Sequence, residues 1–131
     1  MAYLIDTQIL IWSLSNPSKL SDSTKKYLEN SEIFVSQISL FEITIKQKIG
    51  KLIEIDLPLA QLINQIQSDG FEILPIKNTH ISAYDQIPLF EHHRDPFDRL
   101  LLATSLSENL PIISADENFR LYTPQIQLIE N

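Results

Sequence analysis

The chain has 131 residues, of which 44% are hydrophobic and 21% are charged, and its net charge is −7. This size and composition indicate one globular domain that can bury about two-thirds of its unfolded surface. Because cysteine is absent, disulfides, thiol catalysis and cysteine-ligated zinc are excluded, and the negative charge argues against binding of nucleic acid by general attraction to phosphate.

The N-terminal region has no signal-peptide pattern. No basic segment follows Met1, and no apolar run approaches the ~18 residues that a membrane span needs. We therefore expect a cytoplasmic protein without a membrane segment. We also expect one domain over residues 1–131, because no repeat, low-complexity tract or linker interrupts the chain.

Short strands and helices are predicted to alternate along the chain. Runs of β-branched and aromatic residues predict the strands, and apolar periodicity with capping signals predicts the helices. In chain order we expect strand 3–5, helix 9–14, helix 21–30, strand 33–35, helix 39–49, helix 58–69, strand 71–76, helix 78–86, helix 95–108, strand 112–114, helix 117–121 and strand 126–129. This alternation predicts an α/β fold with a mainly parallel sheet.

Capping residues support several of these boundaries. Asp95 and Pro96 are typical of the first positions of a helix. Gly50 and Gly70 are the only two glycines, and each follows a predicted helix, where a C-terminal cap favours glycine. No glycine-rich loop remains to cradle a phosphate, so the P-loop and dinucleotide-binding patterns are absent.

Four carboxylates are predicted to meet at one edge of the sheet. Asp6 and Asp116 each follow a short apolar strand, and open α/β folds place their ligands at the carboxyl ends of the strands. Glu42 and Asp98 are each predicted on the first turn of an apolar helix, next to basic residues. Burying four like charges would cost several kcal/mol without a cation. Metal-dependent chemistry is therefore the first hypothesis.

Each acid also has a purely structural interpretation. Asp6 and Asp116 are suited to capping the helices that follow them. Glu42 lies three residues after Ser39, which is the spacing of a capping box, and Asp98 suits the positive end of a helix dipole. The two interpretations differ in whether the four side chains come together in space.

The motifs around these acids resemble those of the PIN-domain ribonucleases, and among them the VapC-type toxins of toxin–antitoxin pairs. The most specific segment is His93-Arg94-Asp95-Pro96-Phe97-Asp98-Arg99-Leu100-Leu101 with Ala103. The other matching segments are Leu4-Ile5-Asp6-Thr7 with Leu10-Ile11-Trp12; Val35-Ser36 and Ser39-Leu40-Phe41-Glu42-Ile43 with Lys46 and Gly50-Lys51-Leu52; and Ile113-Ser114-Ala115-Asp116 with Phe119 and Tyr122. Phe41 stands where the family often has Trp, and Ser114 where Thr is common.

The resemblance implies a single PIN-like domain, with a five-stranded parallel sheet of order 3-2-1-4-5 flanked by helices, and a site for Mg²⁺ or Mn²⁺. The catalytic, metal-binding quartet would be Asp6, Glu42, Asp98 and Asp116. Asp6, Asp98 and Asp116 are the candidates for direct or water-mediated contact with the metal, and Glu42 for a second metal or for orienting water. The implied activity is endoribonuclease hydrolysis of RNA phosphodiester bonds, in which the cation activates water and offsets phosphate charge.

Four residues are candidates for positioning the substrate. Thr7 and Ser114 are placed to hydrogen-bond a water or a phosphate, or to serve only as strand-end hydroxyls. Lys46 is spaced to pair with Glu42 as well as to contact RNA. Arg99 is interpreted either as an RNA contact or as a surface ion pair.

Other residues have less specific patterns. Lys51 and Arg94 are further candidates for contacting the RNA strand. The adjacent residues His92 and His93 are expected to be solvated rather than to bind metal. The aromatic residues Trp12, Phe41 and Phe97 are expected in the core, although an exposed aromatic ring near the site could stack on a base.

The resemblance also implies partners. These are an RNA substrate, a second copy in a homodimer, and a cognate antitoxin protein that extends the assembly to a larger toxin–antitoxin complex. An antitoxin that carries Arg or Lys would suit the acidic site. The apolar residues available for binding it are Trp12, Leu14, Leu59, Ile63 and Ile66.

Two other functions are compatible with an acidic α/β domain. A receiver-type phosphate-binding signalling domain needs paired acids after its first strand and an Asp at the end of its third. Here Asp6 stands alone and the third predicted strand ends in Pro75-Ile76-Lys77. The other alternative is a catalytically silent PIN-like interaction module, which the intact quartet argues against.

Overall fold

Five parallel strands form one sheet in the computed structural model, which describes residues 1–131. The strands are β1 (Ala2–Ile5), β2 (Glu32–Ser36), β3 (Glu72–Leu74), β4 (Ile112–Ser114) and β5 (Leu128–Glu130). Their order in space is β3-β2-β1-β4-β5, and every neighbouring pair is parallel. The predicted fold class and strand order are confirmed. The receiver-type alternative is wrong, because that fold has the order 2-1-3-4-5.

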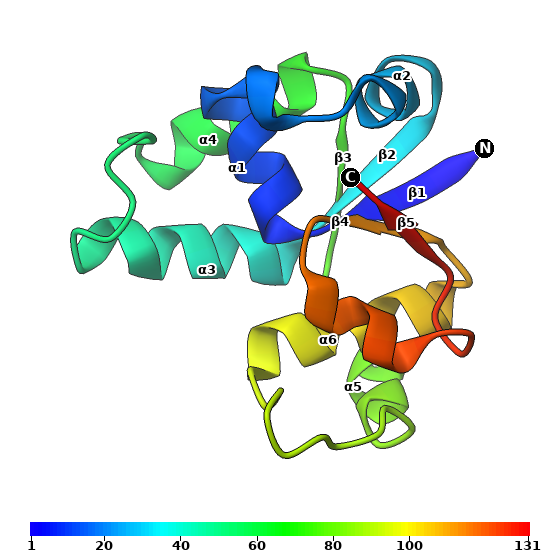
Figure 1. The fold of residues 1–131 in the computed structure, drawn as a ribbon. Coiled ribbons are helices and arrows are strands. Elements are labelled where there is room, and N and C mark those ends of the chain that lie inside the picture. Colours follow the sequence, from blue (N-terminus) through cyan, green and yellow to red (C-terminus); the bar gives the residue numbers. More distant parts are fainter.

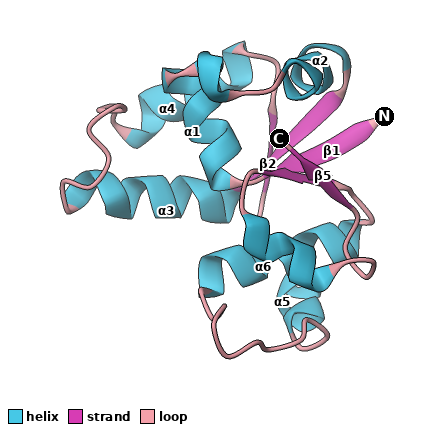
Figure 2. Ribbon diagram, in the orientation of Figure 1, coloured by secondary structure: helices cyan, strands magenta, loops and turns pink.

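Helices cover both faces of the sheet. The α-helices are α1 (Thr7–Ser15), α2 (Asp22–Asn30), α3 (Gln37–Lys48), α4 (Leu59–Ser68), α5 (Asn78–Tyr84) and α6 (Pro96–Glu108), and the 3-10 helices are η1 (Pro17–Lys19) and η2 (Glu117–Tyr122). Helices α1, α2 and α4 lie on one side of the sheet, and α5 and α6 lie on the other (Figures 1 and 2). None of the helices combines the length and the apolarity that a membrane span requires.

The alternation of side chains along β1 explains the two layers. Tyr3 and Ile5 belong to one buried cluster, which α1, α3 and α4 complete. Leu4 points the other way, into a second buried cluster formed with α5 and α6. Both faces of the central strand are therefore apolar, as expected for a parallel sheet.

Helix α3 begins earlier than predicted. Ser36 is its N-cap, and the Ser36 hydroxyl accepts a hydrogen bond from the Ile38 N–H at 3.1 Å. Ser39, the predicted start, is fully buried inside the helix. Glu42 consequently lies in the second turn rather than the first. The capping-box interpretation of Glu42 is wrong.

The start of helix α6 agrees with the sequence. Asp95 caps the helix by accepting a hydrogen bond from the Phe97 N–H at 2.8 Å, and Pro96 is the first helical residue. Asp98 therefore lies in the first turn of α6, as predicted. From this position its side chain reaches the carboxyl edge of the sheet.

Candidate active site

A pocket of about 340 Å³ opens at the carboxyl edge of the sheet. It lies where β1 and β4 end, and helices α1, α3 and α6 contribute to its wall. The structure brings all four acids of the predicted quartet into its lining, together with Asp95, whereas Lys46 is its one cationic lining residue. Five carboxylates and a single lysine make this pocket strongly acidic.

Asp6 is the most deeply buried of these acids, with 4% of its surface exposed. Its Oδ1 accepts a hydrogen bond from the Ile9 N–H at 2.8 Å, which caps α1, and its Oδ2 accepts one from the Ser114 hydroxyl. Burial, with a smaller contribution from the charges of Asp98 and Asp116, nevertheless raises the pKa of Asp6 to about 7. Near neutral pH, full ionisation of Asp6 therefore requires a positive charge close by.

Ser114 links the two acids that follow strands. Its hydroxyl donates to Asp6 and accepts a hydrogen bond from the Asp116 N–H at 3.0 Å. The side chain is buried and does not line the pocket. These bonds favour the alternative in which Ser114 is a strand-end hydroxyl that orients Asp6 and Asp116. Its contact with a water or a phosphate stays a prediction. Thr7 does line the pocket, but its hydroxyl donates to Ser39 at 2.9 Å, so its contact with substrate stays a prediction.

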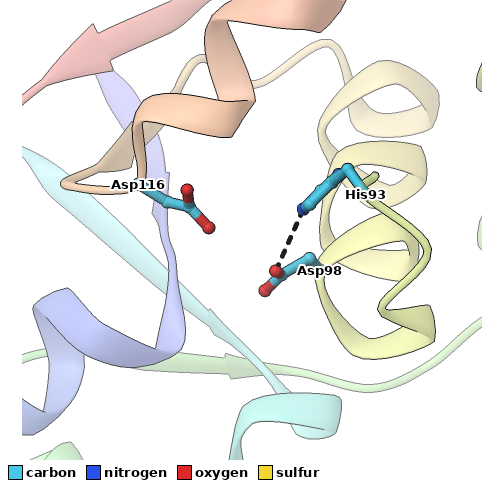
Figure 3. Close-up of side chains that lie close together, drawn as sticks. All are labelled: His93, Asp98 and Asp116. Carbon is cyan, nitrogen blue, oxygen red and sulfur yellow. Dashed lines mark hydrogen bonds and ion pairs between the residues drawn. The ribbon is translucent and has the colours of Figure 1, made fainter. Parts of the chain in front are cut away.

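Asp98 and Asp116 approach each other together with His93. Figure 3 shows the three side chains pointing toward a common space, and one ligand atom from each lies within 4.8 Å of the others. Asp116 also caps η2 by accepting a hydrogen bond from the Asn118 N–H at 2.9 Å. Burial and the charge of Asp95 raise the pKa of Asp98 to about 6, against the effect of its hydrogen bond to His93.

His93 is a buried member of the site that the sequence interpretation missed. Its Nε2 lies 3.2 Å from Asp98 Oδ2, and its Nδ1 lies 2.5 Å from the Tyr122 hydroxyl. Its backbone N–H donates to the Phe90 carbonyl oxygen at 3.2 Å, and its side chain is buried, whereas His92 is exposed. The expectation of a solvated side chain holds for His92 and is wrong for His93. The sequence signal that could have identified His93 was its position just before Asp95 in the most specific matching segment.

Glu42 contributes an unsatisfied oxygen. Its Oε2 pairs with Lys46 Nζ at 3.0 Å, while its Oε1 is buried and has no hydrogen-bond partner. No other buried side-chain oxygen or nitrogen in the protein lacks a partner. Such an atom costs free energy unless a ligand satisfies it. Carboxylate oxygens are the ligands that Mg²⁺ and Mn²⁺ prefer, so this donor set fits the cation that the sequence predicts.

Arg99 is buried and has a structural role. It is 2% exposed, and its guanidinium donates to the Tyr84 hydroxyl at 3.0 Å and to the backbone oxygens of Pro88 and Ile87 at 2.6 and 2.9 Å. These bonds tie α6 to the end of α5 and the loop after it. These bonds use three of the five guanidinium N–H groups. The interpretation as a surface ion pair is wrong, because Arg99 is buried and forms no ion pair. Its contact with RNA stays a prediction.

The predicted core aromatics and apolar residues occupy different environments. Phe41 is 56% exposed, so its assignment to the core is wrong. Its ring centre lies 6.0 Å from that of Phe97, which is half-buried. Trp12 is also half-buried and lines the acidic pocket. Among the apolar residues considered for partner binding, Ile66 is in the core and Leu59 stays 48% exposed.

Comparisons with known proteins agree with this geometry. A family model for the PIN domain matches residues 3–123, and no curated protein matches the chain. The structure is similar to VapBC2 from Rickettsia felis bound to a promoter DNA fragment (18% identity, TM-score 0.71, 99% of this chain and 98% of that chain). It is also similar to DNA-bound VapBC from Salmonella typhimurium (17%, 0.68, 99% and 98%) and to a toxin–antitoxin complex from Klebsiella pneumoniae (21%, 0.64, 97% and 95%). At these identities the structural matches establish a shared fold.

Proposed function

Because the chain belongs to the PIN domain family, we propose that it is a metal-dependent endoribonuclease and the VapC-type toxin of a toxin–antitoxin pair. The observation that carries the proposal is the pocket in which five carboxylates face a single lysine. Helix capping accounts for Asp6, Asp95 and Asp116 one at a time. It does not account for gathering five carboxylates in one pocket, since each acid raises the cost of ionising the next. A cation removes that cost.

The acids would hold Mg²⁺ or Mn²⁺ between them. Asp6, Asp98 and Asp116 are the proposed direct or water-mediated ligands, and the unpartnered Oε1 of Glu42 is the fourth oxygen available. When bound, the cation would supply positive charge for the phosphate oxygens and acidify a water for hydrolysis of the phosphodiester bond. No protein nucleophile is needed for this reaction.

The surrounding residues hold these carboxylates in place before a metal or substrate arrives. Asp6 is oriented by the Ile9 N–H and the Ser114 hydroxyl, and Asp98 by His93. Hydrogen bonds of this kind fix the direction of ligand oxygens and strengthen metal binding. Lys46 offsets part of the charge of Glu42 and is the pocket's one side chain that can attract a phosphate directly.

An antitoxin is the proposed protein partner. The similar solved structures from Salmonella typhimurium and Klebsiella pneumoniae are a VapBC and a toxin–antitoxin complex, which supports a similar assembly for this chain. A basic side chain of the antitoxin would pair with the acids and compete with the cation. We further propose a cytoplasmic homodimer that forms a larger complex with the antitoxin, on the basis of the family resemblance.

A cleavage assay with the metal removed and restored tests the proposed activity. RNA incubated with the purified protein should stay intact in EDTA and be cut once Mg²⁺ or Mn²⁺ is in excess. Co-expression of the neighbouring reading frame should relieve the toxicity of the protein. RNA left intact under all metal conditions would favour the catalytically silent interaction module, and cleavage in EDTA would exclude the metal-dependent mechanism.

A further inference from the structure

A second hollow, of about 470 Å³, adjoins the acidic pocket on the side of helix α1. Gln8, Trp12 and Lys46 line both spaces, so the two lie side by side. We call the second hollow the lysine groove. Its remaining charged lining residues are Lys19, Lys51 and Glu54.

The lysine groove is positively charged, whereas the molecule as a whole is negatively charged. The protein has a net charge of −7 and only 10 lysine and arginine residues, yet three lysines and one acid line this groove. Lys46 is paired with Glu42, but Lys19 and Lys51 are exposed and make no ion pair. Two unpaired positive charges next to an acidic pocket favour an anionic ligand that spans both spaces.

The groove also offers a surface for an aromatic ring. Trp12 is half-buried at the junction with the acidic pocket, and Lys19 Nζ lies 5.8 Å from the centre of its ring. Ile11 and Leu52 line the groove as buried apolar residues. Sites for single-stranded nucleic acid combine these elements, because bases stack on aromatic rings while lysines neutralise the backbone.

We propose that the lysine groove binds the single-stranded RNA that flanks the scissile phosphate. Trp12 stacks on a base next to the acidic pocket, and Lys19 and Lys51 contact the phosphates farther along the strand. Lys46 stands where the strand passes from the groove into the pocket. This assignment rests on the proposed ribonuclease function, since it gives the path of that substrate.

The charges of the groove and the pocket favour RNA over a protein segment as the ligand of the lysine groove. A basic peptide suited to the acidic pocket would be repelled by the groove lysines, and an acidic peptide suited to the groove would be repelled by the pocket. RNA carries a phosphate at every nucleotide, so it satisfies the lysines, and the proposed cation offsets its charge in the pocket. Its bases also supply the flat rings that Trp12 can contact.

The test measures binding without requiring cleavage. Trp12 is the only tryptophan, so its fluorescence reports on the junction of the groove and the acidic pocket. A short single-stranded RNA is titrated into the protein in EDTA at several salt concentrations. We compare Lys19→Gln/Lys51→Gln with Lys25→Gln/Lys26→Gln, a control on α2 that removes the same charge outside the groove and the pocket.

The groove variant should bind about tenfold more weakly at low salt, whereas the control should change affinity by less than about twofold. Losing two phosphate contacts should reduce the slope of log affinity against log salt by about 1.4. RNA should quench Trp12 fluorescence in the wild-type protein and in the control. Lys19, Lys26 and Lys51 are exposed and Lys25 is half-buried, so equal melting temperatures are needed to check that both variants fold.

Three results would overturn the groove assignment: equal affinity and slope in the two variants, unchanged Trp12 fluorescence at saturation, or loss of antitoxin binding with RNA binding intact. The last would assign the groove to the protein partner. Groove-dependent binding in a protein that never cuts RNA would support the groove and contradict the nuclease proposal. The two proposals can therefore fail separately.

Discussion

Helix α6 carries a carboxylate next to a histidine near each of its ends, and the two pairs have opposite electrostatic surroundings. Near the C-terminal end, Glu108 Oε2 lies 2.7 Å from His80 Nε2 and 3.2 Å from Lys77 Nζ. In the first turn, Asp98 lies 3.2 Å from His93 but faces other acids of the pocket. The chemical groups are alike, and the difference lies in what surrounds them.

The pKa directions follow from these surroundings. The hydrogen bond from His80, with Lys77 adding to it, lowers the pKa of Glu108 below 4.5. Burial and nearby acids raise the pKa of Asp98 to about 6. The pair at Glu108 is balanced within the protein, whereas the pair at Asp98 lacks positive charge. An imbalance of this kind in a pocket indicates a site for something absent from the chain itself.

The largest expected effect is the loss of activity when a pocket acid is neutralised. Asp98→Asn or Asp6→Asn should reduce RNA cleavage by about a thousandfold or more, because each change removes a ligand charge at nearly constant volume. Initial rates in Mg²⁺ and calorimetric metal titrations measure the effect. Glu108→Gln is the matched control, and it should leave both quantities unchanged. Full activity with unaltered metal affinity in either pocket variant would remove that residue from the site.

A second prediction concerns stability without metal. The pKa of Asp6 rises from 3.8 to about 7 on folding, so the folded state keeps this proton when the unfolded state has lost it. The contribution of Asp6 to the free energy of unfolding is therefore most favourable below about pH 4. It falls by roughly 4 kcal/mol in total as the pH rises to 7. Asp6→Asn should therefore stabilise the metal-free protein at pH 8 and have little effect near pH 4.

Urea denaturation in EDTA at the two pH values measures this difference. Added Mg²⁺ should stabilise the wild-type protein at pH 8, because a bound cation favours the ionised acids, and should stabilise Asp6→Asn much less. If Asp6→Asn were less stable than wild type at pH 8 without metal, the negative charge of Asp6 would be stabilised by the protein itself, as that of Glu108 is. The comparison between the two regions would then fail.

Local rules predicted the parts of the site that depend on the nearby chain. Asp6 and Asp116 each follow a strand, and Asp95 is the N-cap of a helix whose first residue is Pro96. The positions of these acids could therefore be inferred from the sequence. The register of α3 could not, because Ser36 and Ser39 are both good N-caps and burial of Ser39 in the folded domain decides between them.

The residues that were predicted wrongly have distant or irregular partners. Tyr122, which holds His93, lies 29 positions later in the chain. Arg99 bonds to backbone oxygens in the loop after α5, and no residue pattern encodes the path of such a loop. The exposure of Phe41 likewise depends on which face of α3 the rest of the domain covers. The strand order itself was predicted from the family resemblance, since periodicity alone does not give it.

The third prediction compares the two histidines. His93→Gln should weaken binding of Mn²⁺ by about 10- to 100-fold, because His93 orients Asp98 through its hydrogen bond. His80→Gln should lower the melting temperature, since His80 is buried and bonds to Glu108, but should leave metal affinity unchanged. Calorimetry and thermal melting on both variants separate the two roles. Equal metal affinity in His93→Gln and wild type would make His93 a packing residue only.

The smallest effect is expected at the balanced end of α6, and its sign is opposite to that at Asp6. The pKa of Glu108 is lowered on folding, so its contribution to stability is present above about pH 4.5 and is lost as the pH falls through the folded-state value. The side chain is 25% exposed, and pairs of this kind contribute less than about 1 kcal/mol. Glu108→Gln keeps an acceptor for His80, so it should be slightly less stable than wild type at pH 7 and equal to it near pH 3. Urea denaturation measures the difference in unfolding free energy between each variant and wild type. This difference should rise with pH for Asp6→Asn and fall with pH for Glu108→Gln. If both differences changed with pH in the same direction, the acidic pocket and the C-terminal end of α6 would not have opposite electrostatic surroundings.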